Sequence, residues 1–512
     1  MIPGALQWER VQQWAPQAAV LVVCAFALAL AFPRTDWDGA AWAALAPLFV
    51  MALARAPRAA LGWGWLFGFV YFLVLLRWLN FTFATYSAIP WPLTLLPTAL
   101  LAAYCGLYTG LVACAVAWTA RRRSPAGALV LVPFFWVAGE WVRGHLMGGF
   151  PWGTLGYTQY TMLPVIQIAE LGGVHAVTFV VVGVNAALAG SVLMTWRRAL
   201  TAVALGGVLL GGTLLFGVWR LAEPPPTDEV AIAVVQPSIE QPLKWDPRHT
   251  RATKEILLEL TRRAAADAPQ LIVWPETSAP TALRRDPELL AELTALSASR
   301  DIPLLVGSID VDEGTPPRFW NTAFLVTDRG IAGRYDKIHL VPFGEYVPLS
   351  GVIGFVRGWA EFIADLEPGT QPVVFPGPPA PFGVVICYEG IFPDLVRSFV
   401  KGGARLMVNM TNDGWFGLTS GPEQHLTMYP FRAVEHRISI VRAANTGISA
   451  FILPSGKIVR RMRLFDRDTM TERVPLRVGQ TLFTRLGDWV GLLSLAVTAA
   501  VLGAGVLARR KA

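Results

Sequence analysis

Residues 384–390 read Val-Val-Ile-Cys-Tyr-Glu-Gly, an apolar run that is typical of a buried strand and that ends in a turn. The cysteine in this run, Cys387, is the only cysteine in the stretch 228–475, which is much less apolar than the two ends of the chain. A thiol at the end of a strand is placed to act as a nucleophile, although a strand cysteine is more often a packing residue. The residues that surround this run in the fold decide between the two interpretations.

Two polar segments upstream carry the groups that such a nucleophile needs. Residues 274–277 (Trp-Pro-Glu-Thr) close another apolar run, and residues 335–340 (Tyr-Asp-Lys-Ile-His-Leu) follow later. Glu276 could accept the thiol proton, and Lys337 could stabilise a thiolate or a tetrahedral intermediate. Each residue alone has an ordinary explanation, a turn cap for Glu276 and a solvated side chain for Lys337. Together the three predict acyl-transfer chemistry at strand ends, where α/β sheets place their ligand sites.

The composition indicates a membrane protein. The 512 residues are 54% hydrophobic and 15% charged, with a mean hydropathy of +0.46, which is too apolar for an ordinary soluble chain. The 40–54 run is short and could be an interfacial or buried helix, and the 162–194 run could contain a re-entrant piece around Gly172 and Gly173. Membrane spans are expected at about 16–32, 40–54, 60–80, 92–119, 127–142, 162–194, 199–219 and 487–508.

Basic residues follow every second predicted span. They are Arg55 with Arg58, then residues 121–123, 197–198 and 509–511. Short loops rich in Lys and Arg stay in the cytoplasm, so this alternation predicts seven spans, an insert on the opposite face and an eighth span. The net charge of +7 is largely this loop bias. Because no basic run is interleaved with aromatic residues, a nucleic-acid partner is not expected. The first span lacks a cleavage signature and is expected to be an anchor.

The chain is therefore expected to contain a seven-helix membrane domain (1–222), a globular domain (228–475) and a last membrane helix with a basic tail (486–512). Strand-like runs alternate with amphipathic helical patterns in the globular part, which predicts an α/β domain with buried strands. The apolar segment 341–371 has no helix start or stop and is expected to be a lid or a membrane-contacting loop. Strands are expected at 230–235, 271–273, 304–308, 322–327, 384–386, 406–409 and 448–453, and helices at 251–266, 287–299 and 424–438.

The polar segments resemble the nitrilase superfamily, in which a glutamate, a lysine and a cysteine occur in this order. With the membrane segments on both sides, nearly the whole chain resembles the apolipoprotein N-acyltransferase family. The resemblance implies an α-helical transmembrane bundle and an extracytoplasmic α/β domain with an α-β-β-α sandwich. It implies Glu276 as general base, Lys337 as stabilising cation and Cys387 as acylated nucleophile. The most specific matches are residues 274–277, 335–345, 387–389 and 412–417.

The resemblance also implies a function. An acyl chain would pass from a phospholipid, through a cysteine thioester, to the α-amine of a diacylglyceryl-cysteine apolipoprotein, with ping-pong kinetics and without a cofactor or metal. The protein would lie in the bacterial inner membrane, in contact with membrane lipids, with its catalytic domain in the periplasm. For Trp245, Trp415 and Phe416 a core role is an equal alternative, and Asn321 and Asn412 could hold turns. The implied supporting or substrate-binding residues are Glu345, Tyr388, Glu389, Trp245, Asn321, Asn412, Trp415 and Phe416.

Two other functions are open. A membrane-tethered, nitrilase-like amidase that hydrolyses small amides would share the triad and the chain length. A transporter or scaffold is the other alternative, because ionisable residues in membrane segments often mark transport pathways; the candidates are Glu140, Arg143, His145, Glu170 and His175.

The histidines of the globular part give no metal signature. His339, His425 and His436 lack metalloprotease spacing, and no second cysteine is available there for zinc. We expect structural or loop roles for them, although His339 next to Lys337 could tune the triad electrostatically.

Overall fold

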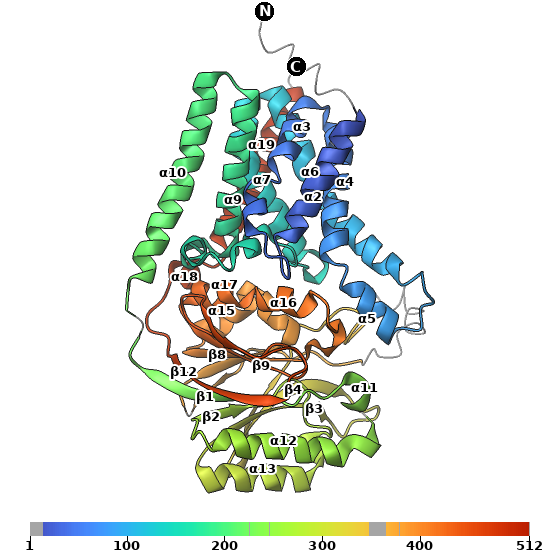
Figure 1. The fold of residues 1–512 in the computed structure, drawn as a ribbon, viewed down its shortest axis with the longest axis vertical. Coiled ribbons are helices and arrows are strands. Elements are labelled where there is room, and N and C mark those ends of the chain that lie inside the picture. Colours follow the sequence, from blue (N-terminus) through green and yellow to red (C-terminus); the bar gives the residue numbers. More distant parts are fainter. Residues whose placement is uncertain (1–13, 225, 245, 348–364, 378, 511–512) are drawn as a thin grey trace, which may run out of the picture. The chain divides into compact units, whose positions relative to one another are not determined.

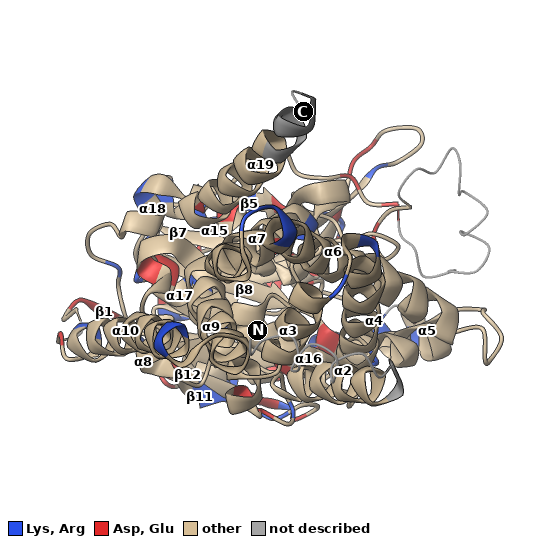
Figure 2. Ribbon diagram, turned by 90° about the horizontal axis from the view of Figure 1, so that it is seen from above, with Lys and Arg blue, Asp and Glu red and all other residues tan. Residues whose placement is uncertain are grey.

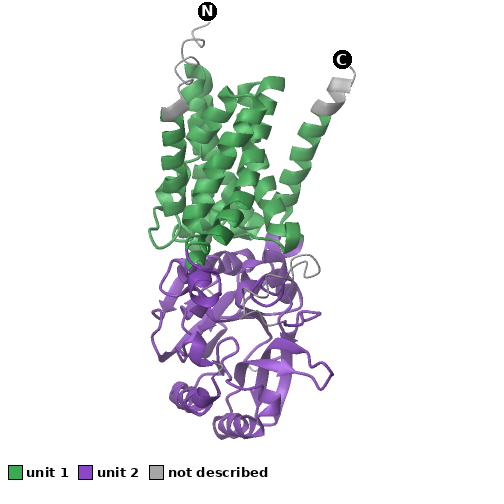
Figure 3. Cartoon of the chain, turned by 90° about the vertical axis from the view of Figure 1, so that its right-hand side faces the viewer, with its two compact units in different colours: residues 1–80, 92–223, 486–512 green, residues 81–91, 224–485 purple. Residues whose placement is uncertain are grey.

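A computed structural model describes residues 14–224, 226–244, 246–347, 365–377 and 379–510. The chain divides into two compact units (Figure 3). Unit 1 consists of residues 1–80, 92–223 and 486–512, and unit 2 of residues 81–91 and 224–485. The short segment 81–91, which lies between two predicted membrane spans, thus belongs to the same unit as Cys387.

Unit 1 is a bundle of apolar helices (Figure 1). In the part of the chain that the structure describes, five helices are long and apolar enough to cross a membrane: α4 (Pro57–Leu75), α6 (Leu95–Arg122), α7 (Pro125–His145), α9 (Ala169–Leu193) and α10 (Trp196–Leu221). Shorter apolar stretches lie in α2 (Trp14–Leu30), η1 with α3 (Asp38–Trp42 and Ala46–Ala54) and α19 (Trp489–Arg510). Each predicted span overlaps one of these helices, and the chain is a membrane protein. The number of bilayer crossings stays a prediction.

Helix α9 is irregular at the two glycines that the sequence singled out. Gly172 has φ −144° and ψ 21°, and Gly173 has φ 71° and ψ −171°, values outside the α-helical region. A Cβ atom on Gly172 would collide with the side chain of Val490 at the start of α19. Beside the break, His175 Nδ1 lies 2.7 Å from Asp488 Oδ2. The glycines therefore allow the last helix to pack closely against α9.

The arginine clusters of unit 1 lie at turns between its helices. Arg55 and Arg58 flank the turn from α3 to α4, residues 121–123 the turn from α6 to α7, and residues 197–198 the start of α10. Figure 2, which looks onto the bundle from above, shows Lys and Arg gathered at these turns, while the helices themselves are almost free of charge. The basic residues therefore mark one end of the bundle.

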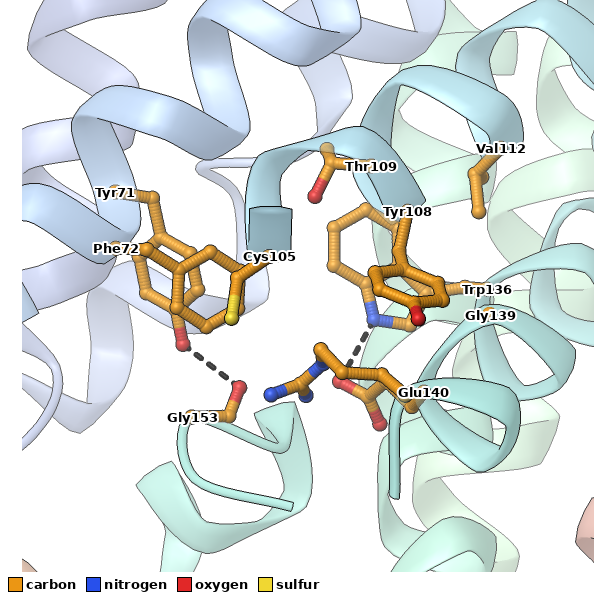
Figure 4. Close-up of a pocket in the computed structure, with 11 residues that line it drawn as sticks. Tyr71, Phe72, Cys105, Tyr108, Thr109, Val112, Trp136, Gly139, Glu140 and Gly153 are labelled. Atoms are coloured by element: carbon orange, nitrogen blue, oxygen red, sulfur yellow. Dashed lines mark hydrogen bonds between the residues drawn. The ribbon is translucent and has the colours of Figure 1, made fainter. Parts of the chain in front are cut away.

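A buried carboxylate lies inside this apolar bundle (Figure 4). Glu140 of α7 is 6% exposed and accepts hydrogen bonds from Trp136 Nε1 (3.0 Å), the Leu155 amide (2.8 Å) and Thr178 Oγ1 (3.0 Å). These donors come from α7, from the irregular segment after it and from α9. Glu140 therefore joins three parts of unit 1 that are distant in sequence.

Arg143, one turn further along α7, holds the same irregular segment through its carbonyl groups. Its guanidinium donates to the carbonyl oxygens of Phe150 (3.0 Å) and Trp152, and Tyr71 Oη donates to the carbonyl of Gly153 over 2.9 Å. Main-chain groups outside a helix need such partners in an apolar environment. The buried Glu140 and Arg143 thus have a structural role in the bundle, and their burial is no argument for a transport pathway.

Unit 2 contains two six-stranded sheets, in the orders β12-β1-β2-β3-β4-β5 and β11-β10-β9-β8-β7-β6. Strands β1, β2 and β3 are parallel, as are β7, β8 and β9. The first sheet contains β1 (Glu229–Gln236), β2 (Leu271–Val273), β3 (Leu304–Val311), β4 (Phe319–Thr327), β5 (Gly330–Asp336) and β12 (Asp468–Pro475). The second contains β6 (Val374–Phe375), β7 (Phe382–Ile386), β8 (Leu406–Thr411), β9 (Ser439–Ala444), β10 (Ala450–Ile452) and β11 (Ile458–Arg461).

Side chains alternate between two cores because successive residues of a strand point to opposite faces. In β1, Val230, Ile232 and Val234 join a core shared with β7 and β8, while Ala233 and Val235 face the helices outside. Helices α12 (Thr250–Ala265) and α13 (Pro287–Arg300) cover the outer face of the first sheet, and α15 (Pro393–Lys401), α16 (Gly421–Leu426) and α17 (Tyr429–His436) cover the second (Figure 1). The predicted α-β-β-α sandwich is confirmed.

Every predicted strand falls on an observed one, and the first two predicted helices are α12 and α13. The single helix expected at 424–438 is wrong. A second helix begins there at Tyr429, with Pro430 in its first turn, and Arg437, with φ 49°, ends it before β9. Among the described residues, five observed strands were not predicted. Strands β5, β11 and β12 are partly exposed and lack an apolar run, β6 has two residues, and β9 is buried but carries Arg442 in its middle. Of the expected loop 341–371, residues 348–364 lie outside the described residues.

We predict that Glu140→Ala destabilises unit 1. The substitution leaves two side-chain donors and one amide without their acceptor, each of which costs about 1–3 kcal/mol when it stays buried. Thermal unfolding of the full chain in detergent would show a lower midpoint. Glu223→Ala is the control, since its carboxylate pairs with Arg220 and is 43% exposed. Equal midpoints for the two variants would contradict the structural role of Glu140.

Candidate active site

Glu276 lies on a sharp turn after β2. The turn continues through Thr277, whose φ of 43° is in the left-handed region. Gly307 of β3 allows this geometry, because a Cβ atom there would collide with the main chain of Pro275 and Thr277. The Glu276 side chain is 6% exposed. Close packing of two strands thus fixes a buried carboxylate at the end of β2.

Lys337 follows β5 directly and extends its pairing with β4, since its amide donates to the carbonyl of Asn321 over 2.9 Å. Its ammonium is 1% exposed and lies 2.9 Å from Glu345 Oε1 and 3.3 Å from Glu276 Oε1. Burial alone lowers the pKa of a lysine, but the carboxylates of Glu345 and Glu276 raise the pKa of Lys337 well above its ordinary value. Lys337 is therefore a permanent buried cation.

Asn321 and Glu345 complete this ion-pair centre. Asn321 Nδ2 donates to Glu276 Oε1 over 2.8 Å and to Glu345 Oε1 over 3.1 Å. The second oxygen of Glu345 accepts the Val341 amide over 2.8 Å. One ammonium and one amide group thus bridge two carboxylates. The centre fixes the side chain of Glu276 and leaves little freedom to Lys337.

Cys387 sits where β7 turns into the 3₁₀ helix η7 (Cys387–Ile391). Its φ of 52° is in the left-handed region, a strained conformation for a residue with a side chain. Two side chains hold its carbonyl oxygen there, Tyr429 Oη over 3.0 Å and Asn409 Nδ2 over 3.4 Å. The strained conformation of Cys387 is thus held by hydrogen bonds from two residues distant in sequence.

The Cys387 thiol lies in the electrostatic field of both predicted partners. Burial and the charge of Glu276 raise the pKa of Cys387, the charge of Lys337 lowers it, and the net pKa is about 12. A thiol whose pKa is raised in this way stays protonated near neutral pH. The resting nucleophile is thus a neutral thiol beside a carboxylate, an arrangement suited to general-base catalysis.

Glu389 joins the cysteine turn to the lysine segment. It is fully buried, and its Oε1 accepts hydrogen bonds from Tyr335 Oη (2.8 Å) and from the amides of Ile338 (2.6 Å) and His339 (3.0 Å). Its Oε2 accepts the Ile386 amide over 2.7 Å. Burial raises the pKa of Glu389 to about 7, while the donors favour its charged form. Through Glu389, the residues on either side of Lys337 are fixed to the strand that ends in Cys387.

A second buried polar network lies behind the nucleophile. Arg442 of β9 donates to Asn409 Oδ1 (2.8 Å) and Asp413 Oδ2 (2.6 Å), and Asp413 Oδ1 lies 3.0 Å from His425 Nδ1. His425 Nε2 lies 3.2 Å from Tyr429 Oη, and the Arg442 guanidinium stacks on the Tyr429 ring at 4.9 Å. The network therefore orients both side chains that hold the Cys387 carbonyl.

The other predicted site residues occupy the neighbouring loops. Tyr388 packs against Phe392, with ring centroids 5.1 Å apart, and the His339 ring stacks on Phe392 at 3.8 Å. The Asn412 side chain holds a turn, since its Oδ1 accepts the Gly414 amide (3.3 Å). Trp415 and Phe416 are half-buried on the same loop. Trp245 lies outside the described residues.

Three features of the site escaped the sequence analysis: the network around Arg442, the role of Tyr429, and a second buried lysine, Lys244. A signal existed for the first, because Arg442 interrupts the otherwise apolar strand β9. Across the residues that the structure describes, His, Cys, Asp and Glu form no group of three or more that could hold a metal ion.

Two family profiles together match most of the chain. The profile described as "Apolipoprotein N-acyltransferase N-terminal domain" matches residues 24–187, and the profile described as "Carbon-nitrogen hydrolase" matches residues 231–482.

Curated relatives are similar over nearly the full length. The apolipoprotein N-acyltransferase of Geobacter metallireducens is 38% identical over 93% of each chain, and that of Haemophilus ducreyi is 32% identical over 92% of this chain and 94% of the relative. Among solved structures, a mutant of the Nesterenkonia AN1 amidase from the nitrilase superfamily is 20% identical, with a TM-score of 0.38, over 53% of this chain and 95% of that chain.

We predict that Tyr429→Phe slows acylation of Cys387 without unfolding the protein. The variant keeps the ring against Arg442 but loses the hydroxyl that holds the Cys387 carbonyl, a bond worth about 1 kcal/mol, or about fivefold in rate. Intact mass spectrometry would follow the acylated fraction over time, with thermal unfolding as the check on folding. Tyr104→Phe, in the hydroxyl pair with Tyr108 of unit 1, is the control. An unchanged acylation rate would contradict this role of Tyr429.

Proposed function

Because the chain belongs to the apolipoprotein N-acyltransferase family, we propose that its lipoprotein N-acylation runs through a thioester on Cys387. Glu276 is the general base, and Lys337 is the cation that stabilises the tetrahedral intermediates. The observation that carries this proposal is the buried ion-pair centre, in which Lys337 Nζ lies 3.3 Å from Glu276 Oε1 and both groups act on the Cys387 thiol. A carboxylate and an ammonium that face one thiol supply the two functions that a neutral thiol lacks.

The first half-reaction takes the acyl chain from a phospholipid. The Cys387 sulfur attacks an ester carbonyl carbon while the thiol proton moves to Glu276. The tetrahedral intermediate collapses with cleavage of the bond between that carbon and the glycerol oxygen. Glu276 returns the proton to this oxygen, so the products are a lysophospholipid and a thioester on Cys387.

The second half-reaction passes the acyl chain to the lipoprotein. The α-amine of the diacylglyceryl-cysteine attacks the thioester carbon, and Glu276 accepts a proton from the amine nitrogen. The carbon–sulfur bond breaks, the proton returns to the sulfur of Cys387, and an amide results. Because the lysophospholipid leaves before the acceptor reacts, the kinetics are ping-pong.

Lys337 stabilises the oxyanion in both half-reactions. A fixed cation in a water-poor site needs no reorganisation when charge develops, and such groups contribute about 3–4 kcal/mol in studied enzymes. Lys337 meets this description because it is 1% exposed and is held by Glu345 and Glu276. Glu345 is then a positioning residue that keeps the ammonium in place while Glu276 changes its protonation state.

We place the enzyme in the bacterial inner membrane with unit 2 in the periplasm. The support is the charge pattern, since the turns rich in arginine lie at one end of the unit 1 bundle and such turns stay in the cytoplasm. Both substrates are anchored in lipid, which accounts for the five long apolar helices in a chain with a nitrilase-like domain.

Hydrolysis of small amides is the less supported alternative. The nitrilase-like sandwich alone would allow it, but the similarity to N-acyltransferases extends through the membrane helices, over 93% of the chain. A transporter or scaffold without activity does not fit the enzyme family.

We predict that Cys387→Ala abolishes both products of the reaction. Purified protein would be incubated with a phospholipid and a synthetic diacylated lipopeptide, and mass spectrometry would measure the lysophospholipid and the triacylated peptide. With phospholipid alone, the wild-type protein gains one acyl mass on Cys387, and Cys387→Ala does not. Cys114→Ala, a substitution of the same kind in α6, keeps both products. Amide hydrolysis by a protein that never carries the acyl group would favour the amidase.

We predict opposite shifts in thiol reactivity for the two charged partners. Glu276→Gln removes a negative charge that raises the pKa of Cys387, so the thiol should be alkylated at lower pH; Lys337→Met removes a positive charge, so alkylation should require higher pH. The measurement is the rate of iodoacetamide labelling of Cys387 against pH, with the wild-type labelling profile as reference. Both variants should lose acyl transfer. A shift in the same direction for both would contradict the assigned charges.

A further inference from the structure

A second lysine lies beside the general base. Lys244 is the last residue of the short helix α11 (Gln241–Lys244) and is 3% exposed. Its ammonium donates to the main-chain oxygen of Glu276 over 3.2 Å and to Thr277 Oγ1 over 2.5 Å. Lys337 thus contacts the side chain of Glu276, whereas Lys244 contacts its main chain and the next residue.

The contacts of Lys244 fall on the strained part of the turn. Thr277 has a φ of 43°, and a non-glycine residue in this conformation persists only where its surroundings hold it. Gly307 leaves space for the turn, but space alone does not select the conformation. The two hydrogen bonds from Lys244 bind the Glu276 carbonyl and the Thr277 side chain, so they hold the main chain of the turn that carries Glu276.

Helix α11 is anchored at its other end as well. Asn412 Nδ2 donates to Gln241 Oε1 over 2.7 Å, and Asn445 Nδ2 donates to Asn412 Oδ1 over 3.2 Å. Because α11 is a single turn of helix, it has little stability of its own. Its position, and with it the position of the Lys244 ammonium, therefore depends on the loop that follows β8.

We propose that Lys244 is a positioning residue of the acyl transfer, which fixes the turn that carries Glu276 and adds a second positive charge toward Cys387. This inference rests on the function proposed above and extends it from three residues to four. Burial lowers the pKa of Lys244 to about 8, while the charges of Glu276 and Cys387 oppose that shift. The charge of Lys244 therefore interacts with the charges of both the base and the nucleophile, as expected of a residue in the reaction centre.

Two negative groups and three positive groups, the third being Arg442, surround the thiol together with one tyrosine. A substitution of Lys244 therefore changes one charge near the thiol, while the other charges stay in place. The charged or titratable groups that face Cys387 are Glu276 after β2, Lys337 after β5, Lys244 of α11, Asp413 after β8, Tyr429 of α17 and Arg442 of β9.

The test separates charge from geometry. Lys244→Met keeps the length of the side chain but loses the charge and both hydrogen bonds, and Thr277→Val loses one hydrogen bond while the charge stays. We expect Lys244→Met to lower the rate of thioester formation by about tenfold or more. We also expect it to slow iodoacetamide labelling of Cys387 below pH 8, where Lys244 is charged. Thr277→Val should slow thioester formation and leave the labelling profile in place. Lys254→Met, which removes a lysine paired with Asp286 in the same unit, should match the wild type in both.

Three results would overturn the proposal. The first is a wild-type acylation rate in Lys244→Met. The second is a slower rate with an unmoved labelling profile and a lowered unfolding midpoint, which would make Lys244 a stability residue only. If Lys244→Met does not fold, Lys244→Arg takes its place, and slower labelling below pH 8 in that charged variant is the third. Absence of any thioester in the wild-type protein would instead refute the proposed function, and the labelling profiles would still report on Lys244.

Discussion

The buried carboxylate of Glu389 is the constraint on which the site depends. A charge removed from water is tolerated only when donors surround it, and here the donors come from two segments about fifty residues apart. Three of them belong to the stretch around Lys337, and the fourth is the amide of Ile386, directly before Cys387. Moving either segment would leave a buried carboxylate without partners. The nucleophile and the cation are therefore fixed relative to one another by the cost of exposing Glu389, and not by a contact between themselves.

Because the segments are fixed in this way, the charged groups of the site stay apart and do not form a single neutral ion pair. Lys337 is shared by Glu276 and Glu345, so neither carboxylate neutralises it alone. Burial keeps the thiol protonated, which prevents a thiolate from competing for Lys337 before substrate arrives. Charge then appears on the sulfur and on the substrate oxygen only during the reaction, at a place where the cation is already oriented. In the proposed mechanism, Glu276 can accept and return a proton because Glu345 keeps Lys337 in place.

The sequence predicted those residues of the site that can be recognised within one short segment of the chain. Glu276, Lys337 and Cys387 each end an apolar run or a strand, and β2 and β7 were visible because both faces of these strands are buried. The residues that were not predicted depend on contacts between segments that are distant in sequence. Lys244 reads as one polar residue in a polar loop, and its burial follows from the packing of α11 against a turn thirty residues away. Strand β9, which holds Arg442, was not predicted. The partners of Arg442 are Asn409 of β8 and Asp413 in the turn after it, so no local pattern predicts them.

The extent of the catalytic unit could not be read from the sequence either, and it differs from the segment that matches the carbon–nitrogen hydrolases. Residues 81–91, between α4 and α6, belong to unit 2: Thr82 Oγ1 donates to the carbonyl of Trp415 over 2.9 Å, and Tyr86 Oη to that of Gly414 over 3.1 Å. The loop that they hold begins beside Asp413, which supports the network behind Cys387. A catalytic part cut out at residue 224 would lose these contacts. The membrane part of the chain therefore supplies a piece of the catalytic unit as well as an anchor, and this piece lies next to the residues that hold the nucleophile.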